Sequence, residues 1–208
     1  MKFFVDTADI KEIEELIPTG FVDGVTTNPS LIAKNGDDMA KTIKAICSIV
    51  PGPVSAEVTA TDFDTMLQEG EYLASLAKNV AVKVPLTTNG LKTCKTLRKK
   101  NIMVNVTLCF TAAQALLAAK AGASFISPFV GRLDDLGENG MDLIEDIVDI
   151  YDNYDFDTEV LVASIRSTQH VIDAAVIGAH VSTLPPKVIH ELYNHPVSYT
   201  HLTLPTKA

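Results

Sequence analysis

The pentapeptide AVKVP at residues 81–85 places a lysine, Lys83, inside a short apolar run. Runs of branched apolar residues are typical of buried β-strands, and a lysine is seldom buried without a partner. Burial disfavours the charged form of an amine, and a neutral amine is a nucleophile toward carbonyl carbons. The run alone leaves open a catalytic lysine and a strand-edge lysine whose amine reaches solvent. The rest of the chain favours the catalytic interpretation.

Polar residues recur near the carboxyl ends of the other apolar runs, on one parity of the two-residue strand period. They are Asp6, Asn28, Glu57, Asn105, Thr107, Ser127, Ser164 and Arg166, with Phe129 on the same face as Ser127. Taken singly, Asp6 or Ser164 is explained as a helix cap, and Glu57 as the partner of a surface lysine. Buried polar groups are costly unless they bond to one another or to a ligand. The whole set therefore predicts a polar binding site.

Eight apolar runs with helical patterns between them predict the fold. The runs cover residues 2–6, 24–28, 54–58, 80–85, 102–108, 125–130, 159–165 and 180–185, and the clearest helical patterns cover 9–17, 87–100, 111–121 and 141–151. Alternating strands and helices form a parallel sheet, and eight units can close into a single-domain (β/α)8 TIM barrel. A doubly wound sheet would begin with a glycine-rich turn. Here the first run continues into DTAD, so we expect the barrel.

Composition limits the partners. The formal charge of −9 over 208 residues argues against nucleic acid or an anionic membrane as a partner. An anionic substrate must then be held by a few placed cations. The three cysteines show neither a paired motif nor metal-ligand spacing, which is typical of a reduced cytosol. The start MKFFVDTAD reaches an aspartate too early for a signal peptide, and no run is long enough to span a bilayer. We therefore expect a cytoplasmic protein.

Four sequence blocks resemble those of a known family. GVTTNPSLIA (24–33), AVKVP (81–85), SPFVGRLDD (127–135) and ASIRS (163–167) are similar to the transaldolases, specifically to the short, single-domain subfamily that includes the fructose-6-phosphate aldolases. The resemblance runs from residue 1 to about residue 196. It implies transfer of a dihydroxyacetone unit in the pentose phosphate pathway, from sedoheptulose 7-phosphate or fructose 6-phosphate to glyceraldehyde 3-phosphate or erythrose 4-phosphate. It implies no metal or organic cofactor.

The resemblance also implies catalytic roles. Lys83 forms a Schiff base with the C2 carbonyl of a ketose phosphate, and the resulting iminium accepts the electrons of the C3–C4 bond as it breaks. Asp6 takes the C4 hydroxyl proton during cleavage and returns it during addition. Glu57 and Thr107 hold a catalytic water that moves protons while the carbinolamine forms and dehydrates.

Substrate-binding positions follow from the same resemblance. Asn28 and Ser127 match positions that hydrogen-bond the three-carbon dihydroxyacetone unit. Arg132 and Arg166, with Ser164, match the phosphate site, and two guanidinium groups are suited to hold a dianion in an acidic protein.

Three alternatives remain. Fructose-6-phosphate aldolases typically carry glutamine at the position of Glu57 and tyrosine at the position of Phe129, so this chain has the transaldolase residues at both. A different class I aldolase, such as one acting on deoxyribose phosphate, usually has a second lysine near the reactive one, and the strand ends show none. A non-catalytic barrel that binds sugar phosphates would not require the set of Asp6, Glu57, Lys83 and Thr107.

The C-terminus departs from the family pattern. After residue 196 a family member continues into an amphipathic helix, whereas VSYTHLTLPTKA (197–208) has no helical stripe and contains Pro205. We expect a barrel over 1–196, a non-native tail over 197–208, and a last helix that is missing or replaced. The family resemblance implies a homo-oligomer, commonly a pentamer-based decamer with C-terminal helices at subunit contacts. The altered terminus leaves the oligomeric state of this chain open.

Overall fold

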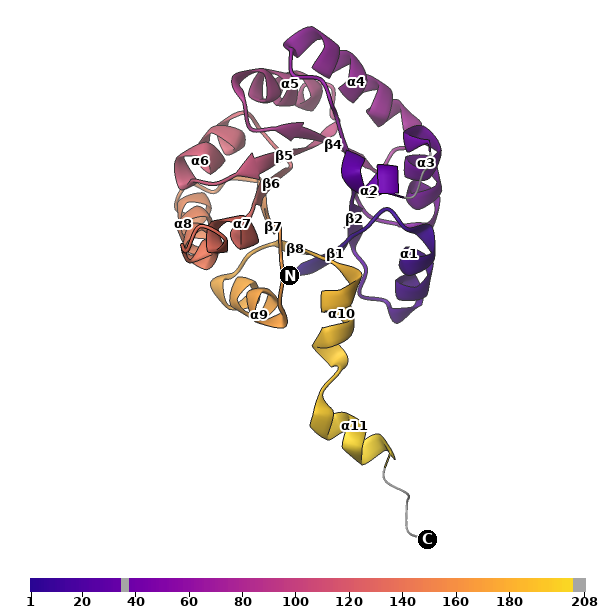
Figure 1. The fold of residues 1–208 in the computed structure, drawn as a ribbon. Helices are drawn as coiled ribbons and strands as arrows, with labels where there is room; N and C mark the ends of the chain where they lie inside the picture. The colour runs from indigo at the N-terminus through magenta and orange to yellow at the C-terminus, as the bar shows by residue number, and fades with distance from the viewer. Residues whose placement is uncertain (35–37, 204–208) are drawn as a thin grey trace.

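The computed structural model describes residues 1–34 and 38–203 and forms a closed eight-stranded barrel (Figure 1). Each strand pairs in parallel with the next along the chain, and β8 pairs with β1. The strands are β1 Lys2–Asp6, β2 Gly24–Thr26, β3 Val54–Glu57, β4 Val80–Pro85, β5 Met103–Cys109, β6 Phe125–Pro128, β7 Glu159–Val162 and β8 Val181–Leu184. The predicted single-domain (β/α)8 barrel is confirmed.

The helices lie outside the barrel, most of them in a ring around it (Figure 1). They are α1 Ile10–Leu16, the 3-10 helix η1 Ile17–Thr19, α2 Pro29–Lys34, α3 Met39–Ile49, α4 Phe63–Leu76, α5 Thr88–Arg98, α6 Ala112–Lys120, α7 Val130–Asp134, α8 Gly140–Asn153, α9 Thr168–Ile177, α10 Pro186–Tyr193 and α11 Pro196–Thr203. The four predicted helical ranges correspond to α1, α5, α6 and α8. Many of the helices begin at a side-chain cap, which satisfies their first N–H groups. These caps are Asp9, Asp38, Asp62, Thr87, Thr111, Asn139 and Ser167.

Three strands end two or more residues earlier than predicted, because the chain leaves the sheet to build loops at the barrel mouth. The second strand ends at Thr26, so Asn28 lies beyond it, where its side chain accepts a hydrogen bond from the Leu31 amide of α2 at 2.9 Å. The sixth ends at Pro128, and Val130 belongs to α7. The seventh ends at Val162, ahead of the predicted residue 165.

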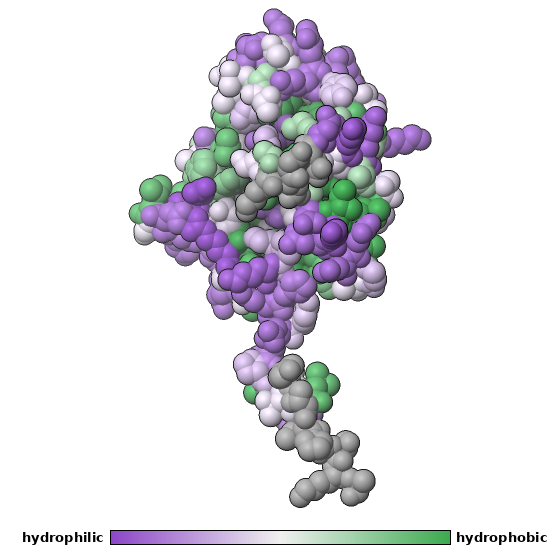
Figure 2. Space-filling view, turned by 45° about the vertical axis from the view of Figure 1, so that its right-hand side comes forward, coloured by the Kyte–Doolittle hydropathy of each residue, from purple (hydrophilic) through white to green (hydrophobic). Residues whose placement is uncertain are grey.

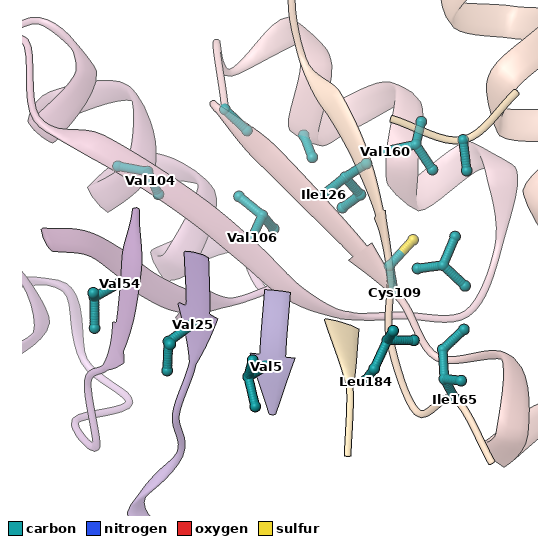
Figure 3. Close-up of a cluster of buried hydrophobic side chains, with 14 of the residues drawn as sticks. Val5, Val25, Val54, Val104, Val106, Cys109, Ile126, Val160, Ile165 and Leu184 are labelled. Carbon is teal, nitrogen blue, oxygen red and sulfur yellow. The ribbon is translucent and has the colours of Figure 1, made fainter. Parts of the chain in front are cut away.

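Outward-facing strand residues form the main hydrophobic core, between barrel and helices. Figure 3 shows part of it, with Val5, Val25, Val54, Val104, Val106, Ile126 and Val160 on their strands. Helix residues such as Ile13, Ile43 and Leu97 complete it and are fully buried. Each apolar side chain buried in this layer contributes about 1.5–3 kcal/mol, so the outer core stabilises the barrel strongly.

Inward-facing residues form two layers inside the barrel. The layer toward the amino ends of the strands is apolar and contains Phe4, Ala81, Phe125, Leu161 and Val181. Phe4 and Phe125 meet edge to face, with ring centroids 5.8 Å apart. A Cβ on Gly24 would lie 2.6 Å from the Phe4 ring, so glycine makes room for this ring. Two residues further along β1, β4, β6 and β8 the inward side chains are polar, at Asp6, Lys83, Ser127 and Thr183, which places the polar set above an apolar floor.

Helix α10 packs on β8 and α9, with Val188 and Ile189 buried in the core, whereas α11 projects away from the barrel (Figures 1 and 2). The segment predicted to lack a helical stripe nevertheless forms a helix at Pro196–Thr203. Its residues Val197 and Leu202 are 57% and 84% exposed, so this helix does not pack as an amphipathic last helix would. The boundary at 196/197 and the non-native origin of the tail stay predictions, and residues 204–208 lie outside the described residues. Across 1–34 and 38–203, no helix is long and apolar enough to cross a membrane.

Candidate active site

Lys83 points into the barrel from β4 and is paired with a carboxylate. Its side chain is 9% exposed, and its Nζ lies 2.9 Å from Oε2 of Glu57, the residue beside it in register on β3. The amine also donates to the backbone oxygen of Thr27 at 3.3 Å. These contacts rule out the interpretation of Lys83 as a strand-edge lysine with its amine in solvent, and they rule out a surface partner for Glu57.

Asp6 ends β1 on the same inward face. Its Oδ1 accepts a hydrogen bond from Oγ1 of Thr26 at 2.8 Å, and that hydroxyl lies 2.6 Å from Oγ1 of Thr183. Enclosure in the barrel raises the pKa of Asp6 above its ordinary value, while the Thr26 hydrogen bond and the Lys83 charge act in the opposite direction. A carboxyl group with raised proton affinity is suited to both accept and return a proton.

A chain of hydrogen bonds fixes the polar side chains of the neighbouring strands. Ser127 donates to Oδ1 of Asn105 at 2.7 Å, and Asn105 Nδ2 donates to Oγ of Ser55 at 3.1 Å. All three residues are buried. Because these partners determine which way each group points, Ser127 is preorganised at the pocket wall.

A pocket of about 160 Å³ lies at the carboxyl ends of the strands. It is lined by Asp6, Thr26, Asn28, Lys83, Ser127, Phe129, Arg132, Ala163, Ser164 and Thr183. Seven of the ten predicted site residues are therefore brought together. The other three, Glu57, Thr107 and Arg166, are not part of the lining, although Glu57 contacts Lys83 directly.

Thr107 is buried on β5, and within the described residues its hydroxyl has no hydrogen-bond partner. The strand is irregular directly after it. The register shifts between Val106 and Cys109, and Leu108 has a left-handed φ of 61°. Strain and bulges of this kind often occur next to functional groups. An unpartnered buried hydroxyl here leaves a bond for a water or a substrate.

Two arginines share one carboxylate next to the pocket, which Arg132 lines and Arg166 does not. Arg166, in the loop after β7, makes a two-point ion pair with Asp135, from Nη1 to Oδ1 and from Nη2 to Oδ2, the latter at 2.5 Å. Nη1 of Arg132 on α7 lies 3.8 Å from Oδ2 of the same aspartate. The hydrogen bond from Arg166 lowers the pKa of Asp135, which is therefore a carboxylate at neutral pH.

The backbone brings these arginines together through a close approach of two loops. The Gly131 amide donates to the backbone oxygen of Ser164 at 3.2 Å, and a Cβ on Gly131 would lie 2.4 Å from that oxygen and 2.6 Å from Nε of Arg166. Ser164 itself has a left-handed φ of 60°. Only glycine permits α7 to approach the loop after β7 so closely.

Phe129 follows β6 and forms an isolated bridge with Ala163, the residue after β7. Its ring lies edge to face with Phe110, at a centroid distance of 5.9 Å, and lines the pocket. A phenyl ring cannot donate a proton, so this wall is apolar. No group of three or more His, Cys, Asp or Glu side chains among the described residues is arranged as a metal site.

Sequence reasoning missed four contributors to the site: Thr26, Ser55, Thr183 and Asp135. The first three lie on the inward parity of their strands, so applying the same parity rule to hydroxyl residues would have found them. Asp135 carries no comparable signal, because its pairing with Arg166 joins two loops separated by 31 positions.

Comparisons with known proteins agree with this arrangement. The family model described as "Transaldolase/Fructose-6-phosphate aldolase" matches residues 3–207. A "Probable transaldolase" of Rhodospirillum centenum is 63% identical over 199 residues, covering 95% of this chain and 86% of that protein. One of Parvibaculum lavamentivorans is 64% identical over 199 residues, covering 95% and 91%.

A solved structure of inosine 5' monophosphate dehydrogenase from Legionella pneumophila superposes with a TM-score of 0.63. It is 16% identical and covers 89% of this chain and 58% of that one, which is a likeness of fold alone. The similarity to the two probable transaldolases supports the expected enzyme class, a transaldolase. The chain belongs to the transaldolase/fructose-6-phosphate aldolase family.

Proposed function

We propose that the protein transfers a dihydroxyacetone unit from a ketose phosphate to an aldose phosphate through a Schiff base on Lys83. The observation that carries the proposal is the Lys83 amine inside the barrel, held 2.9 Å from Glu57 and lining one pocket with Asp6. A buried amine held in one orientation inside a polar pocket is suited to attack a carbonyl carbon.

The reaction begins when Nζ of Lys83 attacks C2 of the ketose phosphate. The carbinolamine loses water, and Glu57 and Thr107 hold the water that moves the protons. The iminium then withdraws the electron pair of the C3–C4 bond, while Asp6 takes the C4 hydroxyl proton and the aldehyde leaves. The remaining enamine attacks the carbonyl of the acceptor aldose phosphate, and Asp6 returns the proton to the new hydroxyl. Hydrolysis of the new iminium releases the product ketose phosphate.

Binding is divided along the pocket. Asn28 and Ser127 hydrogen-bond the three-carbon unit near Lys83, while Arg132, Arg166 and Ser164 hold the phosphate at the rim. The donors are sedoheptulose 7-phosphate and fructose 6-phosphate, and the acceptors are glyceraldehyde 3-phosphate and erythrose 4-phosphate. We further propose that the protein is a cytoplasmic homo-oligomer that acts in the pentose phosphate pathway without a metal or organic cofactor. The family resemblance implies a pentamer-based decamer.

A second candidate is a fructose-6-phosphate aldolase, which releases free dihydroxyacetone. Phe129 argues against it, because its ring lines the pocket without a group that can protonate the enamine. An enamine that is not protonated persists until an aldehyde acceptor enters. Glu57 also argues against it, because glutamate is the residue expected of a transaldolase at this position.

The test is a two-substrate assay. Fructose 6-phosphate is supplied with and without erythrose 4-phosphate, and both sedoheptulose 7-phosphate and free dihydroxyacetone are measured. We expect transfer to exceed release by a wide margin. Release without an acceptor at the rate of transfer would assign the chain to the aldolases. No turnover and no borohydride-trapped adduct on Lys83 would leave only a sugar-phosphate binding module.

Phe129→Tyr is expected to raise release of dihydroxyacetone relative to transfer. A phenol at this wall can protonate the enamine and shorten its lifetime. The measurement is the ratio of the two products in the same assay. Phe110→Tyr provides a matched control, because Phe110 contacts Phe129 but is not part of the pocket lining. An unchanged product ratio in Phe129→Tyr would show that the side chain at this position does not control the lifetime of the enamine.

Arg132→Ala and Arg166→Ala are each expected to raise KM for phosphorylated sugars by about 10- to 100-fold. Losing a hydrogen bond to a charged group costs roughly 1.5–3 kcal/mol. Free dihydroxyacetone as donor has no phosphate, so its KM is expected to change little. Lys187→Ala removes an exposed charge on α10 as a control. An equal rise in KM for both donors would show that these arginines do not bind the phosphate.

A further inference from the structure

The carboxylate of Asp135 lies between the two arginines proposed to bind phosphate. It takes two hydrogen bonds from Arg166 and lies 3.8 Å from Arg132. All three side chains are 44–66% exposed, so the cluster is open to solvent, next to the pocket that Arg132 lines. An anion therefore already occupies the cation pair in this structure.

The ion pair holds Arg166 on one side of the rim. Arg132 and Ser164 line the pocket, whereas Arg166 does not. Its two terminal nitrogens both face Asp135, and they form the donor fork that would bind two phosphate oxygens. A carboxylate and a phosphate offer a guanidinium the same kind of bidentate partner.

We infer that Asp135 is an internal counterion that the substrate phosphate must displace from Arg166, and that it sets the preference of the site for dianions. This inference rests on the proposed function. A dianionic phosphate attracts the two guanidinium groups more strongly than a single carboxylate does, so it can replace Asp135. A monoanionic group gains less from this exchange, and an uncharged sugar leaves Asp135 on Arg166.

Arg166 is also positioned independently of Asp135, which separates the counterion role from a structural one. The Arg166 amide donates to Nδ1 of His170 at 3.4 Å, and Nε2 of His170 lies 3.2 Å from Asp134. Asp134 in turn accepts a hydrogen bond from the Gly140 amide at 3.0 Å. Since these contacts hold the loop, removing the Asp135 charge is expected to free the guanidinium without unfolding the rim.

Asp135→Asn tests the inference, with inorganic phosphate as the probe. Its dissociation constant is measured by calorimetry for the wild type, Asp135→Asn and Glu71→Gln, which removes an exposed, ion-paired carboxylate elsewhere. We expect Asp135→Asn to bind phosphate about two- to fivefold more tightly, the range measured for exposed ion pairs. Glu71→Gln is expected to match the wild type. KM for fructose 6-phosphate is expected to fall while kcat and the KM for free dihydroxyacetone stay constant.

Equal or weaker phosphate binding by Asp135→Asn would overturn the inference, because it would make Asp135 a positioning residue or a bystander. Asp135→Ser removes the same charge and decides the question if the asparagine variant unfolds, which thermal melting reports. In an Arg166→Ala background the gain from Asp135→Asn is expected to shrink, and an undiminished gain would contradict displacement from Arg166. Failure of the proposed phosphate site is a separate result, namely phosphate binding that is unaffected by Arg132→Ala and Arg166→Ala.

Discussion

Lys83→Arg is expected to abolish turnover, by at least about three orders of magnitude, together with borohydride trapping of a ketose phosphate. Arginine keeps the positive charge and much of the volume next to Glu57, but its guanidinium is never neutral in a protein. The variant therefore tests nucleophilicity rather than charge. Lys120→Arg, at the exposed end of α6, is the matched control and is expected to retain full activity. Substantial activity in Lys83→Arg would disprove the Schiff-base mechanism.

Asp6→Asn is expected to lower kcat by about 10²- to 10⁴-fold, the range for losing a general acid–base group. Asparagine keeps an oxygen that can accept the Thr26 hydrogen bond at 2.8 Å, so the geometry is retained while proton transfer is lost. Trapping on Lys83 is expected to persist, because Schiff-base formation does not require Asp6. A kcat within a fewfold of the wild type would remove Asp6 from the proton transfer.

The same variant is expected to keep or gain stability at neutral pH. The pKa of Asp6 is raised on folding, from an ordinary value of 3.8. Its contribution to stability is therefore fully present below the unfolded pKa and is lost as pH rises through the folded pKa. At neutral pH the enclosed charge opposes folding, and asparagine removes it. Thermal melting at neutral pH measures the stability of the variant relative to the wild type. The difference in melting temperature between the two proteins is expected to shrink in acid.

The barrel could be predicted because both strand faces are buried. Parallel strands covered on each side give runs of branched apolar residues, such as those ending at Asp6 and Pro85, and these runs located all eight strands. Strand ends were less accurate, because a strand ends where the chain turns into a loop, as at Thr26 and Pro128. That turn depends on contacts with α2 and α7 rather than on apolar patterning.

Strand-borne site residues could be predicted for the same reason, and loop-borne ones less well. Side-chain parity places Lys83 and Ser127 inward as soon as the strand is located. Asp135 and Arg166 meet only because Gly131 brings two loops into contact, and no periodicity in the sequence encodes that meeting. The family resemblance supplied the proposed roles of the arginines, while the carboxylate between them emerged only from the structure.

The apolar layer beneath the pocket has a kinetic consequence. Phe4, Phe125 and Leu161 close the barrel one step below the residues that line the pocket, so substrates enter and leave at the carboxyl ends of the strands. In the proposed reaction the three-carbon unit stays covalently attached to Lys83, in a pocket of about 160 Å³. The aldehyde fragment must leave by this opening before the acceptor can enter. The enzyme is therefore expected to follow a ping-pong order, in which each aldose phosphate at high concentration competes with the ketose for the unmodified lysine.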